Sequence, residues 1–177
     1  MNQIARQKYT AVAIWLHWII GFALLAQLAL GLYMVDIPKE TPDRGWYLNL
    51  HKSIGVTLAL FILLRICWRL VRRPPPLDRL IPAWQVIASK ISHSVLYLGM
   101  VAMPVTGMIM SSNSKYGVKV WGIPLIAGSD DKSAREFWLE LHEITADILI
   151  VVIAIHVLAS LKHLMIEKNG IFQRMLP

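Results

Sequence analysis

Four long apolar stretches alternate with short polar segments along the chain. They cover about residues 11–35, 51–71, 91–111 and 139–166, and few charged side chains interrupt them. A membrane-spanning helix needs roughly 20 mostly apolar residues, and each stretch reaches that length. The pattern therefore predicts an all-α fold: an integral membrane four-helix bundle that forms a single domain over residues 1–177.

The polar segments predict how the helices are connected. Residues 36–49 contain Pro, Gly and Asp and are expected to form a turn. Three consecutive prolines, Pro74 to Pro76, cannot continue a helix and end the second one. Residues 81–89 are expected to form a separate short helix at the membrane surface, and residues 112–132, rich in Gly, Ser and Asn, a loop.

Composition and charge agree with a membrane protein. The chain is 56% hydrophobic and only 16% charged, whereas charged residues make up about a quarter of soluble domains. If the amino terminus is cytoplasmic, the cytoplasmic segments contain many basic residues but only two acidic ones, Asp78 and Glu167. The bases are Arg6, Lys8, Arg65, Arg69, Arg72, Arg73, Arg79, Lys90, Lys162, Lys168 and Arg174.

The opposite loops hold more acids than bases. These acids are Asp36, Glu40, Asp43, Asp130, Asp131, Glu136 and Glu140. Because basic residues accumulate on the cytoplasmic side of membrane proteins, both termini and the middle loop are predicted to be cytoplasmic. We attribute the net charge of +7 to the membrane topology and to contact between basic residues and anionic membrane lipid. Its spread over three segments argues against nucleic-acid binding.

Histidines are the most unusual polar residues in the apolar stretches. His142 and His156 are 14 residues apart, which separates them by about 21 Å along a helix but leaves both on nearly the same face. His51 and His142 each follow an arginine by seven residues, so they are expected at one depth. His17 lies nine residues from Lys8 and His156 six residues from Lys162, two lysines of the cytoplasmic side, so these histidines are expected at a second depth, nearer that side.

Two histidine pairs at two depths suggest two metal centres with an imidazole on each side of the metal. Haem iron fits, because two histidines fill its axial positions and leave a centre suited to single-electron transfer. Cys67 is the only cysteine and no Cys-x-x-Cys-His sequence is present, so thioether attachment is excluded and the haem is expected to be b-type. Zinc or copper is the alternative, although zinc prefers four protein ligands.

Other residues are candidates for contact with the haem groups. Gly21 and Gly55 lie one turn from His17 and His51, where a flat macrocycle needs a helix surface without side chains. Close packing of helices through small residues explains these glycines equally well. Arg65 is the first candidate for the propionates of the cytoplasmic-side haem and Arg69 the second, and snorkelling to the membrane surface is the alternative for both.

Three further residues have two readings each. His93 and His163 are read as histidines at the membrane surface, or else as contacts for a quinone or for propionates. Asp147 is an acid within the fourth apolar stretch and is read as a proton relay or as a neutral hydrogen-bonding group.

The chain resembles the prokaryotic cytochrome b561 family. The resemblance is carried by Leu16-His17-Trp18, by His51 to Gly55, by Trp68-Arg69 with the following prolines, and by His142-Glu143 with His156. The end of the chain, Glu167 to Pro177, is similar as well.

This resemblance implies a bacterial inner-membrane protein with two haem b groups, whose ligands fall on His17, His51, His142 and His156. It also implies electron transfer from a periplasmic reductant to membrane quinone. Superoxide is one candidate reductant, in which case the protein is a quinone-reducing oxidoreductase of the superoxide oxidase type. The alternative is a cytochrome b subunit docked to a partner dehydrogenase or electron carrier through residues 113–135.

Overall fold

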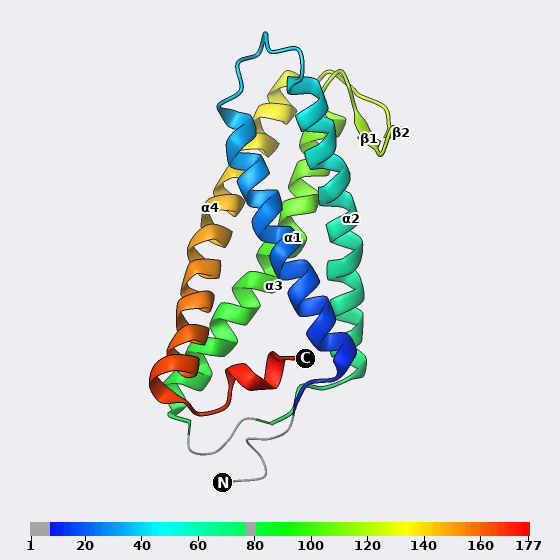
Figure 1. Ribbon diagram of the computed structural model, residues 1–177. Coiled ribbons are helices and arrows are strands. Elements are labelled where there is room, and N and C mark those ends of the chain that lie inside the picture. Colours follow the sequence, from blue (N-terminus) through cyan, green and yellow to red (C-terminus); the bar gives the residue numbers. More distant parts are fainter. Residues whose placement is uncertain (1–7, 77–80) are drawn as a thin grey trace.

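The computed structural model describes residues 8–76 and 81–177, and in this part of the chain four helices are long and apolar enough to cross a membrane. They are α1 (Ala11–Val35), α2 (Arg44–Val71), α3 (Ala83–Ser112) and α4 (Lys132–Lys162). They form one elongated bundle (Figure 1), which confirms the predicted four-helix membrane fold.

Each end of the bundle has its own cover. A hairpin of β1 (Val118–Val120) and β2 (Ile123–Ile126) lies at the end where α1 is followed by α2, and we call this the hairpin end (Figure 1). At the opposite end, the terminal end, α4 passes into a π-helical turn, η2 (His163–Glu167), and a short 3₁₀ helix, η3 (Phe172–Met175). Trp18 donates a hydrogen bond from Nε1 to the carbonyl of Met175 at 2.7 Å, so the chain's end packs onto the start of α1.

Three predicted helix boundaries were wrong, while α1 agrees with its prediction. Helix α2 begins seven residues before His51, at Arg44, and α4 begins at Lys132, where the side chain of Asp131 accepts a hydrogen bond from the Ala134 amide. The separate helix over residues 81–89 does not exist, because α3 runs without a break from Ala83. Hydropathy marks only the part of a helix inside the hydrocarbon, whereas these helices continue into the polar headgroup region.

The loop predicted over residues 112–132 contains the β-hairpin, which the sequence did not reveal. The strands have three and four residues and their register shifts between Val118 and Lys119, so no alternating pattern is long enough to recognise. Arg6, Asp78 and Arg79, which entered the charge prediction, lie outside the described residues.

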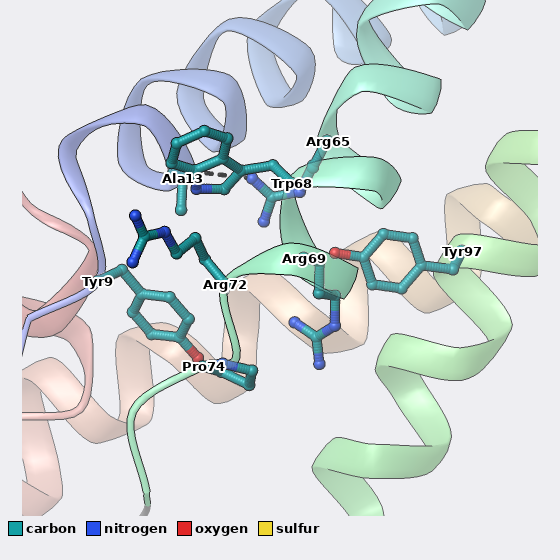
Figure 2. Close-up of a pocket in the computed structure, with 8 residues that line it drawn as sticks. All are labelled: Tyr9, Ala13, Arg65, Trp68, Arg69, Arg72, Pro74 and Tyr97. Atoms are coloured by element: carbon teal, nitrogen blue, oxygen red, sulfur yellow. Dashed lines mark hydrogen bonds between the residues drawn. The ribbon is translucent and has the colours of Figure 1, made fainter.

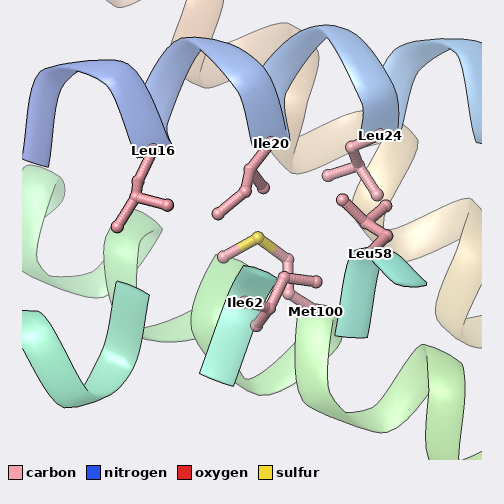
Figure 3. Close-up of a cluster of buried hydrophobic side chains, with 6 residues drawn as sticks. All are labelled: Leu16, Ile20, Leu24, Leu58, Ile62 and Met100. Carbon is pink, nitrogen blue, oxygen red and sulfur yellow. The ribbon is translucent and has the colours of Figure 1, made fainter. Parts of the chain in front are cut away.

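The helices pack as two pairs, α1 with α2 and α3 with α4. A buried cluster joins α1, α2 and α3 in the middle of the bundle (Figure 3), and consists of Leu16, Ile20, Leu24, Leu58, Ile62 and Met100. Leu149 of α4 is completely buried against Gly99 of α3, where a β-carbon would lie 2.6 Å from the leucine Cδ2. Leu149 is seven residues from both His142 and His156, so an apolar layer separates two polar ones.

Candidate functional site

The structure brings four of the histidines together as two pairs. His51 of α2 faces His142 of α4 near the hairpin end, and their ring centroids are 6.4 Å apart; this is the hairpin-end pair. His17 of α1 faces His156 of α4 toward the terminal end, with centroids 6.2 Å apart; this is the terminal-end pair. Each pair therefore connects the α1/α2 half of the bundle to α4.

The spacing within each pair fits a metal ion held between two imidazoles. Metal–imidazole bonds are about 2.0–2.1 Å long and a ring nitrogen lies about 1.1 Å from its centroid, so a shared ion separates coaxial rings by about 6.2–6.4 Å. The ring planes cross at 81° and 75°, and crossed planes are compatible with a shared metal because rotating a ring about its metal–nitrogen bond does not change the bond length.

The number of ligands distinguishes a macrocycle from a bare ion. Within residues 8–76 and 81–177, no group of three or more His, Cys, Asp or Glu side chains is arranged to hold a metal. Cys67 is exposed to the outside of α2. A site with two protein ligands needs its remaining ligands from the cofactor, which is what a haem provides and a bare zinc or copper ion does not.

Helix α3 supports the hairpin-end pair through a hydroxyl group. The Thr106 hydroxyl lies 3.0 Å from His142 Nδ1 and 2.9 Å from the carbonyl oxygen of Ala102. If the hydroxyl donates to that carbonyl, it accepts from an Nδ1–H of the histidine. This arrangement leaves His142 Nε2 free for a metal, and the hydrogen bond to Thr106 fixes the ring orientation, as is common for metal-bound histidines.

The opposite ring of this pair has an unpaired polar atom. His51 Nδ1 is buried and has no hydrogen-bond partner among the described residues. A buried polar nitrogen without a partner is costly. The His51 ring is therefore held by packing, for example against Gly31, and not by a hydrogen bond from its Nδ1 atom.

Two glycines that the sequence analysis missed lie against these rings. A β-carbon on Gly107 would be 3.0 Å from His142 Cε1, and one on Gly31 would be 3.3 Å from His51 Cε1. A small residue is thus required beside each ring. In the sequence, Gly31 and Gly107 are recognisable only as glycines within apolar helices. Which side chain each of them contacts depends on how the helices are rotated in the bundle.

The glycines proposed from the sequence have other surroundings. A β-carbon on Gly55 would lie 3.1 Å from Gln27 Nε2, so close helix packing accounts for Gly55. Gln27 in turn donates to the carbonyl of His51 at 2.8 Å. Gly21 faces open space within 4 Å, which leaves room beside the terminal-end pair.

The terminal-end pair lies beside cationic and aromatic groups. Arg65 donates to the carbonyl of Ala13 at 2.9 Å, and its other nitrogen is 3.4 Å from His17 Nδ1. The second contact is long for a hydrogen bond. If His17 carries its hydrogen on Nδ1, both groups are donors, and the guanidinium then acts on the ring as a nearby positive charge and not as a hydrogen-bond partner.

A pocket opens next to Arg65 on the terminal end (Figure 2). Its lining is Tyr9, Ala13, Arg65, Trp68, Arg69, Arg72, Pro74 and Tyr97. Among the described residues that line this pocket, three carry guanidinium groups and none carries a carboxylate, and Arg69 lies over the ring of Tyr97 at 5.3 Å. Such a lining suits anionic oxygens such as carboxylates.

His93 is not a surface histidine, contrary to the preferred interpretation of the sequence. Because α3 begins at Ala83, His93 lies ten residues into the helix, half-buried, with its ring 5.4 Å from that of His156. It is therefore a third imidazole at the terminal-end pair.

His163 opens the π-helical turn that ends α4. Its Nδ1 is 2.7 Å from Glu167 Oε2, and Lys162 and Gln85 both donate to Glu167 Oε1 at 2.8 Å. A π-helical turn frequently marks a functional position, because it places side chains where a regular helix would not.

Asp147 lies apart from both pairs. It is exposed on the outer face of α4, and its carboxylate has no hydrogen bond or ion pair to any residue within the described ranges. The structure does not connect it to a chain of polar groups that a relay would need.

Comparisons with known proteins agree over nearly the whole chain. The model of a family described as prokaryotic cytochrome b561 matches residues 8–177. Cytochrome b561 homolog 2 of Escherichia coli K12 is 30% identical, over 96% of this chain and 92% of that protein. Cytochrome b561 homolog 1 of the same organism is 26% identical, over 96% and 97%. A probable superoxide oxidase, CybB, of Yersinia pestis is 23% identical, over 97% of each chain.

Proposed function

Since this chain belongs to the prokaryotic cytochrome b561 family, whose members are membrane electron-transfer proteins that bind haem b, we propose that it binds two haem b groups and passes electrons across the bacterial inner membrane to quinone. The observation that carries the proposal is the presence of two histidine pairs, 6.4 and 6.2 Å between centroids, at opposite depths of one bundle. His51 and His142 would hold one haem, and His17 and His156 the other.

Haem b, when bound, would supply one-electron oxidation and reduction, and the four histidines would hold it. The protein's part is to fix the imidazoles, exclude water and set the local charge. Thr106 and Gly107 fix His142, and the apolar layer around Leu149 keeps water from the space between the pairs.

Cationic groups mark the hairpin end as the entry side for an anionic reductant. Lys52 follows His51 directly and lies within electrostatic range of Lys119 and Arg135. The loops at this end are acidic overall, but a local cluster of cations raises the concentration of an anionic reactant in its own vicinity. Superoxide fits this patch: it gives up one electron, becomes dioxygen and needs no open position on the iron.

The terminal end suits quinone reduction, which consumes two electrons and two protons. Lys162, Glu167 and His163 form a connected set of polar groups, from a partly exposed amine to a half-buried imidazole. We propose that this set delivers protons to the quinone, with His93 as a second polar contact near His156. Two superoxide ions then balance one quinone reduced to quinol.

Arg65 and Arg69 are proposed to bind the propionates of the haem held by the terminal-end pair. Both line the pocket in Figure 2, and Arg65 already reaches the His17 ring. We also propose that this end is cytoplasmic, because the basic residues gather there and the acidic loops lie at the other end.

The first test is a reduced-minus-oxidised absorption spectrum combined with a pyridine haemochrome assay on the purified protein. Two b haems per chain with a low-spin spectrum support the pairing, one haem shows that a pair is misassigned, and none overturns the proposal. Reduction of a soluble quinone analogue by enzymatically generated superoxide then tests the reaction. If the purified protein holds two haems but is inactive, and a dehydrogenase co-purifies from native membranes, the partner-docked subunit is correct instead.

A further inference from the structure

The β-hairpin folds back along the outside of α2. Lys52 donates from Nζ to the carbonyl of Gly117 at 3.1 Å, and Ser53 Oγ accepts from the Trp121 amide at 2.9 Å. Trp121 also donates from its indole Nε1 to Thr57 Oγ1 at 3.1 Å. The hairpin is therefore fixed against the helix surface from Lys52 to Thr57, with its tip at the deeper position.

The position of Thr57 in α2 gives the depth of the hairpin tip. A hydrocarbon layer of about 30 Å corresponds to about 20 helical residues. Counted from Arg72, at the end of α2, this layer reaches Lys52. Thr57 lies five residues farther in, about 7.5 Å below that level. The indole of Trp121 is thus at or just inside the boundary of the hydrocarbon, where tryptophan is enriched in membrane proteins.

The outer surface of the hairpin is mostly apolar from Trp121 onward. The exposed fractions are 61% for Trp121, 63% for Ile123, 57% for Leu125 and 45% for Ile126. Lys119, opposite Pro124, is the one charged residue within the two strands, and its long side chain allows the amine to reach the headgroups. This surface continues into exposed Leu60 and Leu64 of α2, which lie deeper in the membrane span.

The backbone of the hairpin tip is compatible with this depth. Trp121 and Gly122 form a two-residue turn in which both have positive φ, 50° and 85°, and such turns join paired strands tightly. Backbone groups in a lipid environment need partners within the protein. The Trp121 amide has one in Ser53, and β1 and β2 pair with each other. The outer edge of β2 has no partner strand among the described residues, so the insertion is limited to the interfacial layer, where headgroups and water bond to the backbone.

We propose that the β1–β2 hairpin is a lipid-contacting element that inserts its Trp121–Ile126 surface into the bilayer leaflet at the hairpin end. The apolar part of this segment thereby faces lipid, and docking of a water-soluble partner protein is left to the charged base formed by Lys115 and Asp130. The inference rests on the membrane span of α2 and is independent of the haem and quinone assignments.

Nitroxide accessibility in vesicles of phosphatidylethanolamine and phosphatidylglycerol tests the proposal. Cys67→Ser provides the background, and Leu125→Cys carries the spin label. Leu64→Cys on α2 is the matched lipid-exposed control, and Ser129→Cys, at the base of the hairpin, is the matched water-exposed control. All three labelled positions are exposed in the structure, so the spin label does not have to fit between packed helices.

The expected result is that a label at Leu125 collides with oxygen severalfold more often than with a water-soluble nickel complex, as at Leu64. A label that behaves like the one at Ser129 overturns the proposal and makes the hairpin an aqueous surface. Protection from both reagents also overturns it, because a protein then covers the surface. The far-ultraviolet circular dichroism spectrum and gel-filtration profile of each labelled variant, compared with the wild type, establish that the bundle has folded.

Discussion

The two histidine pairs have nearly the same internal geometry but different surroundings. Centroid separations of 6.4 and 6.2 Å give both the same capacity to hold a metal between them. At the hairpin-end pair, Thr106, Gly31 and Gly107 are the immediate neighbours, and they are neutral and small. At the terminal-end pair, the neighbours are a guanidinium group and a third imidazole, from Arg65 and His93.

This difference shows how one fold can tune two similar centres separately. A cation close to a redox site stabilises an added electron by Coulomb attraction, more so where the dielectric constant is low. If the terminal-end pair holds a haem, Arg65 would raise its reduction potential relative to a neutral environment. Such an effect would favour electron movement toward the terminal end, the direction of the proposed function, and it would have to exceed that of Lys52 at the other end.

The largest expected effect is the loss of one centre. His51→Ala removes one ring of the hairpin-end pair, and we expect the haem content to fall from two to one per chain, because a single axial ligand remains. Pyridine haemochrome analysis of the purified variant measures this. His163→Ala is the control and should retain two haems, since the structure pairs His163 with Glu167 and with neither histidine pair.

The same substitution at the other pair sharpens the comparison. His93 lies 5.4 Å from His156, so His17→Ala leaves a second imidazole close by, whereas no third histidine adjoins His51 within the described residues. We expect His17→Ala to keep part of its second haem and the His17→Ala/His93→Ala double variant to lose it. Equal haem contents in these two variants would show that His93 cannot substitute.

A smaller effect is expected from crowding one pair only. Gly107→Ala places a β-carbon 3.0 Å from His142 Cε1, so the ring has to shift, at a cost of about 1–3 kcal/mol for overpacking. We expect a lower melting temperature of the haem-loaded protein and weaker retention of one haem. Gly45→Ala is the matched control, because nothing lies within 4 Å of its β-carbon position and it stands in the first turn of α2, before His51. Equal losses of haem and of melting temperature in both variants would contradict the role of Gly107 in leaving space for the His142 ring.

The smallest effect concerns charge without a change of ligands. Arg65→Gln removes the guanidinium beside His17 but leaves all four paired histidines in place. We expect little loss of haem and a fall in the midpoint potential of the terminal-side haem on the order of tens of millivolts, because a nearby positive charge is lost. Potentiometric titration of both haems measures this. Lys52→Gln, whose ammonium is turned toward the Gly117 carbonyl, should shift the terminal-side potential much less. A shift of both potentials by the same amount would refute the separate tuning of the two pairs.

Much of the architecture followed from residue type and spacing. Apolar length predicted four membrane helices, because a bilayer demands about 20 apolar residues in each. The 14-residue spacing of His142 and His156 predicted two layers on one face of a helix, because helical rise and periodicity are fixed by the backbone. Helix ends were less predictable, since polar turns beyond the hydrocarbon, such as Arg44 to Asn49, leave no hydropathy signal.

What only the tertiary structure decided was which side chains from other helices meet these histidines. Rotation of α3 brings Thr106 and Gly107 to His142 and places His93 beside His156, and no local pattern encodes that rotation. The hairpin was equally hidden, because its position depends on hydrogen bonds to Ser53 and Thr57, more than 60 residues away. The sequence alone determined the spans and the depths of the ligands, whereas contacts between helices, which depend on side-chain packing across the bundle, determined the surroundings of each pair.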